Sequence, residues 1–180
     1  MTDTPVRDVS PIVGRPAADP APPSAPATVL DALDRRILAE LQRDAAQSNL
    51  ALAARVHASA PTCLRRVRRL VQAGVIERQV ALLAPGALGS VLTALCEVTL
   101  DAQNAERLAA FQALACREPA VTQCYQVSPG PDFLLVVLLP DMPAYQALAQ
   151  RLFTASAHVR NVRTFFAVNR AKFETQVPFA

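Results

Sequence analysis

The spacing of apolar residues changes once along this 180-residue chain, close to Pro85. Before that point the apolar residues recur every three or four positions, which is typical of helices that bury one side. After it, segments rich in β-branched and aromatic residues alternate with segments of helical spacing, which is typical of mixed strands and helices. The chain is therefore expected to be α+β, with a helical domain followed by a domain that combines a sheet with helices.

Composition divides the chain further. Residues 1–28 hold seven of the fifteen prolines and no aromatic residue, so they cannot bury enough apolar surface to offset the entropy lost on ordering. We expect them to form a disordered tail. Residues 29–80 are assigned to the helical domain, 81–90 to a linker, 91–172 to the mixed domain and 173–180 to a C-terminal tail.

The helical domain is predicted to contain three helices, over about residues 32–43, a short stretch that buries Leu52, Ala53 and Val56, and residues 60–73. Each is preceded by a residue that favours helix N-caps. These caps are Asp31, Ser48 and Ser59. Gly74 is placed to end the third helix in a left-handed conformation, and the following stretch 75–83 is expected to form a short strand or wing.

The third helix carries four arginines within five positions, in the stretch PTCLRRVRRLVQAGVIER. Residues 29–80 hold nine basic and five acidic residues, and they contain all of the excess positive charge of the chain. Such a cluster fits an internal acidic face, an anionic membrane or a nucleic acid. Helical salt bridges do not explain it, because this helix has no acidic residue to act as an i,i+4 partner.

A helical wheel separates the two sides of the third helix. The apolar side is formed by Cys63, Leu64, Val67, Leu70 and Val71. The opposite side holds Thr62, Arg65, Arg66 and Arg69, and we assign these four residues to DNA contact because a major groove accepts one helix and arginine suits both phosphates and base edges. Arg68 lies at the margin and is expected to pair with Asp34 or Glu40. The order of helices and wing predicts a winged helix-turn-helix.

The mixed domain is predicted to run strand, helix, strand, strand, helix, strand. The six segments are 91–100, 105–118, 120–128, 132–140, 141–156 and 159–170. This order is that of the split βαβ, ferredoxin-like fold. The helices would cover one sheet face and leave the other apolar face bare, with Phe165 and Phe166 pointing to opposite faces.

Both halves resemble the leucine-responsive and asparagine-operon regulator (Lrp/AsnC) family of prokaryotic transcription factors. The similar stretches include LDALDRRILAELQRDAAQSNLALAARV, TCLRRVRRL, VSPGPDFLLVVLLPDMPAY and VRNVRTFFAV, and they span about residues 30–172. The resemblance implies a homodimer that binds double-stranded DNA at a pseudo-palindromic operator and can assemble further into tetramers or octamers. It also implies control by a small molecule, usually an amino acid.

The implied effector site has one departure from the family pattern. The loop between the second and third strands reads Pro129, Gly130, Pro131, Asp132, so the acidic side chain that could hold an amino group is missing from its usual place. Asp132 either substitutes for it or only opens the third strand. Carried over to this chain, the effector residues are Ser128, Gly130, Asp132, Met142, Thr164, Phe165, Phe166 and Val168.

Other chemistry is less well supported by the residues present. His57 and His158 have no second ligand at metal spacing, so we expect no metal or cofactor, and the four cysteines form no C-x-x-C pair. Cys96, Cys116 and Cys124 are interpreted as reduced core residues of a cytoplasmic, nucleoid-associated protein. No segment predicts a membrane span. We expect no enzyme activity; the alternatives are a sirohaem-decarboxylase-like enzyme of the same architecture and an effector-sensing module that does not bind DNA.

Overall fold

The computed structural model describes residues 28–179 except residues 90 and 157. The predicted disordered tail therefore lies, apart from Thr28, outside the described residues. The described chain divides into two compact units. One holds the residues up to Leu82 together with the segment from Phe173, and the other holds Leu83–Lys172.

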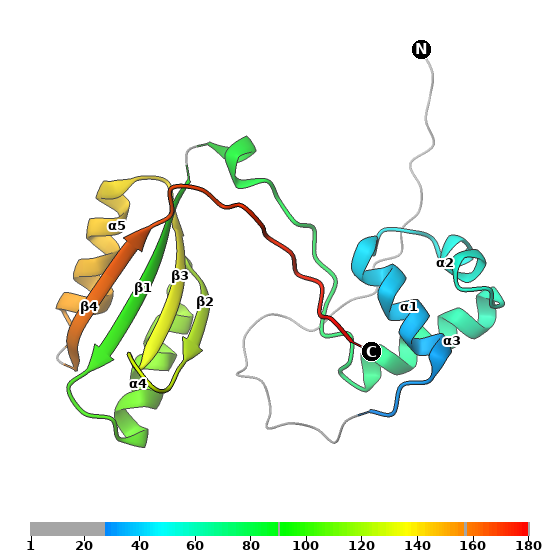
Figure 1. Ribbon diagram of the computed structural model, residues 1–180, viewed down its shortest axis with the longest axis horizontal. Coiled ribbons are helices and arrows are strands. Elements are labelled where there is room, and N and C mark those ends of the chain that lie inside the picture. The colour runs from blue at the N-terminus through cyan, green and yellow to red at the C-terminus, as the bar shows by residue number, and fades with distance from the viewer. Residues whose placement is uncertain (1–27, 90, 157, 180) are drawn as a thin grey trace, which may run out of the picture. The chain divides into compact units, whose positions relative to one another are not determined.

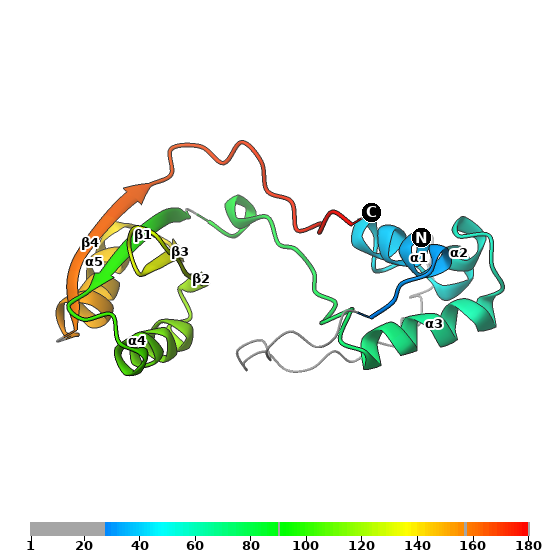
Figure 2. The same cartoon turned by 60° about the horizontal axis from the view of Figure 1, so that its bottom comes forward.

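Three helices form the first unit (Figure 2). They are α1 (Ala32–Arg43), α2 (Asn49–Arg55) and α3 (Ala60–Gln72). The predicted caps are confirmed, because the side chains of Asp31, Ser48 and Ser59 each accept a hydrogen bond from a first-turn amide. The three helices enclose one core, formed by Ile37, Leu38, Leu52, Ala53, Val56, Cys63, Val67 and Leu70.

Two residues with positive φ bound α3. His57 (φ 53°) lies in the turn before it, and Gly74 (φ 71°) follows its last turn. The amide of Gly74 donates to the Val71 carbonyl at 3.0 Å and the amide of Val75 donates to the Leu70 carbonyl at 2.9 Å. This left-handed end confirms the expected role of Gly74 and satisfies carbonyls that the helix leaves free.

Residues 75–83, expected to form a short strand or wing, form no strand. Val75 and Ile76 pack against the three-helix core, but residues 77–84 are irregular. A strand needs a neighbouring strand to pair its backbone groups, and the first unit contains none among its described residues. The alternating pattern was therefore not sufficient to predict a strand.

The second unit confirms the predicted ferredoxin-like order (Figure 1). After the short 3-10 turn Pro85–Leu88, its elements are β1 (Leu92–Leu100), α4 (Ala105–Arg117), β2 (Val121–Gln126), β3 (Phe133–Leu139), α5 (Met142–Ala149) and β4 (Val159–Phe166). The helix α5 continues through a π-helical turn, Gln150–Thr154. The antiparallel sheet has the order β2-β3-β1-β4.

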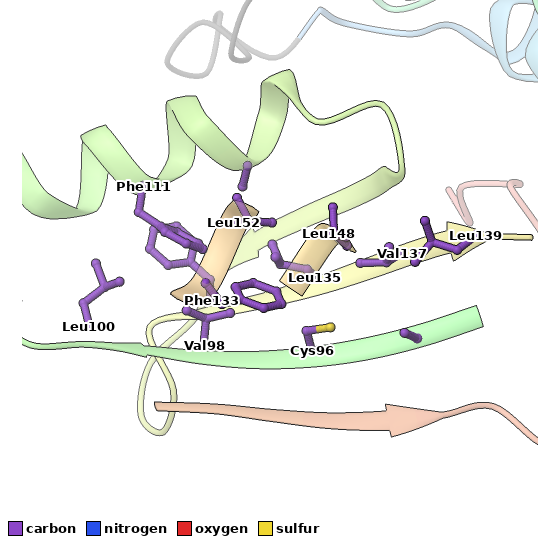
Figure 3. Packing of buried hydrophobic residues seen from close by; sticks show 13 residues of the cluster. Cys96, Val98, Leu100, Phe111, Phe133, Leu135, Val137, Leu139, Leu148 and Leu152 are labelled. Atoms are coloured by element: carbon purple, nitrogen blue, oxygen red, sulfur yellow. The ribbon is translucent and has the colours of Figure 1, made fainter. Parts of the chain in front are cut away.

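Alternate residues of the two central strands fill the core on the helix side of the sheet (Figure 3). On β1 these are Ala94, Cys96, Val98 and Leu100, and on β3 they are Phe133, Leu135, Val137 and Leu139. They pack against α4 and α5 through Phe111, Ala115, Leu148, Leu152 and Phe153. Because strand side chains alternate, the intervening residues point to the other face.

Among the described residues nothing covers that other face, which has an apolar patch beside the Glu97–Arg163 ion pair. It carries Leu95, Tyr125, Leu134 and Phe165, which are between 38% and 54% exposed. The pairings Leu95–Phe165 and Tyr125–Leu134 place these side chains next to each other across neighbouring strands. We call these four residues the bare sheet face. Phe166 points the opposite way, with its ring 5.0 Å from that of Tyr145 on α5, so the predicted divergence of the two phenylalanines is confirmed.

The C-terminal segment returns to the first unit. The side-chain amide of Gln42, near the end of α1, donates to the Val177 carbonyl at 3.2 Å, and its oxygen accepts from the Val177 amide at 2.6 Å. A single side chain thus pairs with both backbone groups of one residue. The segment assigned as a C-terminal tail thus contacts α1 through Val177.

Candidate nucleic-acid interface and ligand site

The buried side of α3 is narrower than the wheel predicts. Cys63, Val67 and Leu70 are at most 4% exposed, whereas Leu64 is 37% exposed. On a wheel of about 100° per residue, the centre of this buried arc lies about 170° from Arg65 and about 70° from Arg66. Arg65 therefore points directly outward, and Arg66 lies on the flank where α3 meets α1.

Arg66 and Arg69 pair with carboxylates of α1 and its cap. Arg66 Nη1 donates to Asp31 Oδ2 at 2.5 Å and to the two oxygens of Asp34 at 3.2 and 3.3 Å. Arg69 Nη2 donates to Asp34 Oδ2. We call these four residues the Asp–Arg cluster. Its two arginines were expected to face outward without carboxylate partners, and the structure shows instead that both are ion-paired.

The predicted pairing of Arg68 with Asp34 or Glu40 is wrong. Asp34 pairs with Arg66 and Arg69, and Glu40 pairs with Arg43 and Arg55. On the wheel, Arg68 and Arg69 lie on opposite flanks of the outer face, and the carboxylates of α1 lie on the flank of Arg69. Arg65 and Arg68 are exposed and form no ion pair with any described residue.

Asp31 and Asp34 also form a capping box, in which each side chain accepts a hydrogen bond from the backbone amide of the other. The Asp34 amide, followed by the Arg66 guanidinium, lowers the pKa of Asp31 to about 2. Asp34 is fully buried, and a buried carboxylate is tolerated only when its oxygens are hydrogen-bonded. The cluster therefore fixes α3 against α1 at the end where α1 begins.

Thr62 lies in the first turn of α3 and is half-buried. Its hydroxyl accepts a hydrogen bond of 2.8 Å from the Ser59 hydroxyl. The Thr62 hydrogen remains available for an acceptor outside the chain, because a hydroxyl both accepts and donates. The same turn thus contains a helix cap and a free donor.

Most of the predicted effector residues fall into two groups, one toward each end of the sheet. Ser128, Gly130 and Asp132 line a hollow of about 380 Å³ together with Gln103 and Gln126. They lie at the end where Asp132 bonds to Val98.

The second group lies toward the other end, where Ala94 pairs with Phe166 and Leu92 with Leu139. It holds Met142, Phe165, Phe166 and Val168. Thr164 belongs to neither end, because it pairs with Cys96 near the middle of β1. At about 3.3 Å per residue, the six residues from Val98 to Leu92 span roughly 20 Å, so one chain does not bring Ser128 and Val168 together.

Asp132 has a structural role in the described chain. It is 6% exposed, and its Oδ2 accepts a 2.7 Å hydrogen bond from the Leu100 amide. Its own amide donates to the Val98 carbonyl at 2.8 Å. These bonds join the start of β3 to the end of β1.

One polar network was not predicted. The Tyr145 hydroxyl on α5 donates to Thr164 Oγ1 on β4 at 2.7 Å, and Thr164 Oγ1 lies 3.5 Å from Cys96 Sγ. Tyr145 and Thr164 line a second, open hollow of about 430 Å³ beside β4. In the sequence, Tyr145 stands at helical spacing with Leu148 and Leu152, which indicates packing, and its hydroxyl is the signal that could have pointed to this network.

The remaining candidates for chemistry are dispersed. His57 is an exposed turn residue of the first unit, and His158 lies in the second unit with its Nε2 2.5 Å from Arg107 Nη1. Cys116 is exposed, so its interpretation as a core residue is wrong. Burial, followed by the neighbouring Cys116, raises the pKa of Cys124 to about 11.

None of the helices in the described part of the chain could span a membrane.

Comparison with known proteins gives matches to both units. A model described as winged helix-turn-helix DNA-binding matches residues 30–77, and one described as Lrp/AsnC ligand binding domain matches residues 93–177. The leucine-responsive regulatory protein of Rhizobium meliloti is 43% identical over 148 residues, covering 82% of this chain and 95% of that protein. The leucine-responsive regulatory protein of Escherichia coli K12 is 35% identical, with coverages of 82% and 90%.

Solved structures are similar over the same part of the chain. An AsnC family transcriptional regulator from Agrobacterium tumefaciens has a TM-score of 0.78 and 34% identity, covering 83% of this chain and 97% of the other. A transcriptional regulator from Neisseria meningitidis, solved as a complex with L-Met, has a TM-score of 0.78 and 28% identity, with coverages of 83% and 97%. That structure has an amino acid bound to the Neisseria protein.

Proposed function

Because the chain belongs to the Lrp/AsnC family of transcriptional regulators, we propose that it recognises its operator with the outer face of α3. The observation that carries this proposal is the position of Arg65, which is exposed, points away from the core and has no ion-pair partner among the described residues. A helix with one such face fits the major groove. Phosphate contacts supply most of the affinity, and base-edge contacts supply the sequence preference.

Among the residues that the sequence assigns to DNA contact, Thr62, Arg65 and Arg69 keep donors that are free for DNA. Arg68 joins them, since it is exposed and unpaired within the described chain. Of the four assigned residues, Arg66 is the least available for DNA contact, because its Nη1 already donates to three carboxylate oxygens. We therefore propose Thr62, Arg65, Arg68 and Arg69 as the DNA-contacting surface, with Arg66 between this surface and α1.

Salt dependence of DNA binding tests this assignment. Replacing Arg65 by Ala should reduce the slope of log affinity against log salt by about 0.9, the value for one lost phosphate contact, without lowering the melting temperature. Arg117→Ala is the matched control, because Arg117 is an exposed arginine in the second unit. Equal slopes for wild type and Arg65→Ala, measured by fluorescence anisotropy, would contradict the assignment.

We further propose that the regulator acts as a homodimer, which can assemble into tetramers or octamers, on a pseudo-palindromic site. The bare sheet face supports this, since an apolar face of this kind on a single chain is typical of a surface that a second subunit covers. Two α3 helices related by a twofold axis would then meet two half-sites. The cellular location that fits these contacts is the nucleoid, in the cytoplasm of a prokaryote.

An amino acid is the proposed effector class. The match to a ligand-binding domain and the L-Met complex of the Neisseria relative support it. The separation of the two groups of effector residues supports a site assembled from two subunits, with Ser128 and Gly130 from one and Val168 from another.

A thermal-shift screen of the twenty amino acids tests the effector. A ligand that binds only the folded state raises the melting temperature in a concentration-dependent way. We expect amino acids of one chemical class to raise the melting temperature at millimolar concentration. If none of them changes the melting temperature, an amino acid is the wrong class of effector.

A further inference from the structure

Asp34 lies at the centre of the Asp–Arg cluster. The exposed fraction of its side chain is 0%, against 50% for Asp31, 22% for Arg66 and 45% for Arg69. Its oxygens accept from both arginines and from the Asp31 amide at 3.1 Å. A carboxylate this deeply buried and this fully bonded holds the groups around it in one arrangement.

The two arginines are held in different ways. Arg66 directs Nη1 to carboxylates, its Nε is buried without a hydrogen-bond partner, and little of its side chain reaches solvent. Arg69 gives only Nη2 to Asp34 and remains about half exposed. An arginine has five N–H donors in a planar fork, so Arg69 can keep its bond to Asp34 and still donate outward.

Resting on the proposed DNA-binding function, we propose that Asp34 is a positioning residue for DNA recognition. It holds Arg69 from the buried side, so that the outer donors of the guanidinium are already oriented towards a phosphate. Together with Asp31, it keeps Arg66 away from the DNA. Ordering a free arginine on binding lowers affinity by roughly two- to tenfold, and Asp34 removes that loss in advance.

The charge of the same carboxylate has the opposite effect on DNA affinity. A negative charge beneath a DNA-binding face repels phosphates, so an Asp34 that acted only through its charge would weaken binding. Asp34→Asn, which keeps the size of the side chain, separates the two effects. Positioning predicts weaker DNA binding by about two- to tenfold, and charge alone predicts tighter binding.

A double-mutant cycle shows whether Asp34 acts through Arg69. The four proteins are wild type, Asp34→Asn, Arg69→Ala and the double variant, each as the full chain. The probe is a duplex that the wild-type chain enriches from a random-sequence library, and affinity is measured by anisotropy. Asp34→Asn should weaken binding in the wild-type background and have little effect in the Arg69→Ala background.

Arg65→Ala provides the matched background, where Asp34→Asn should retain its full effect. A merely structural role of Asp34 would weaken binding equally in all three backgrounds, and that result, or tighter binding by Asp34→Asn, would overturn the proposal. Should Asp34→Asn not fold, Asp34→Glu takes its place, because it keeps the charge and a side chain suited to a capping box. The longer Glu side chain displaces Arg69, so Asp34→Glu should weaken DNA binding only when Arg69 is present.

The salt slope tests the role of Arg66. Arg66→Met should lower the melting temperature and leave the slope unchanged, whereas Arg69→Ala should reduce the slope by about 0.9. A reduced slope for Arg66→Met would place Arg66 on a phosphate. If the wild-type chain enriches no duplex, the proposed function itself fails; if it does and Arg65→Ala reduces the slope, only the role of Asp34 is at issue.

Discussion

Asp31 joins two local roles in one side chain. It caps α1 by accepting the Asp34 amide at 2.9 Å, and it pairs with Arg66 at the surface of the Asp–Arg cluster. The capping role follows from the sequence, since Asp before a helical pattern is a common N-cap. The pairing does not follow from it, because Arg66 lies 35 residues away.

The lowered pKa of Asp31 predicts how stability changes in acid. Its pKa is about 2 in the folded chain against an ordinary value of 3.8, so the folded state favours the charged form. The resulting contribution to stability is complete above about pH 4 and is lost as the pH falls towards 2. Asp31→Asn keeps a capping oxygen but has no charge to titrate.

Urea unfolding of both proteins between about pH 4 and pH 2 checks this expectation. The free energy of unfolding of wild type should fall more steeply with acidification than that of Asp31→Asn. Parallel curves would show that Asp31 ionisation is not linked to folding. Because Asp31 is a surface residue, high salt should reduce the difference.

At the scale of elements, boundaries set by local chemistry were predicted well. Helix α1 has the expected limits, and α3 ends one residue earlier than predicted, before Gly74. Caps and left-handed glycines act on their own neighbours in sequence, so a sequence contains the needed information. The order of strands and helices in the second unit was predicted from the spacing of apolar residues, which is also a property of positions close in sequence.

Elements whose existence or orientation depends on a distant partner were predicted less well. The expected strand at 75–83 has no strand beside it. Leu114 follows the buried Phe111 at helical spacing but is 44% exposed, and Arg66 turns to α1 although its wheel position suggested the outer face. In each case a neighbouring element, which periodicity does not specify, determined what was buried.

At the scale of the whole molecule, the chain passes between its two units twice, at Leu82–Leu83 and at Lys172–Phe173. The second passage brings the C-terminal segment back to α1, where Gln42 binds Val177. No periodic signal marks this contact, because it depends on one amide side chain and two backbone groups. The bare sheet face is the other feature of this scale, since a single chain leaves it uncovered.

We expect Phe165→Glu to convert the proposed dimer into monomers. Phe165 lies on the edge strand β4, is 46% exposed and pairs with Leu95 on the bare sheet face. A carboxylate there would have to leave water when the interface forms, and the neighbouring Arg163 already pairs with Glu97. Sedimentation velocity measures the outcome. Leu114→Glu is the control, because Leu114 is 44% exposed on helix α4. A Phe165→Glu protein that stays dimeric would place the subunit interface elsewhere.

The sequence by itself determined the two architectures, the helix limits and the basic character of α3, because periodicity, caps and charge are properties of neighbouring residues. Only the tertiary structure decided which arginines remain free for DNA and which are held by Asp31 and Asp34. It also decided that Ser128 and Gly130 lie at one end of the sheet and Val168 at the other. These outcomes depend on which side chains meet across elements distant in sequence, and those meetings are decided by how the buried faces pack together.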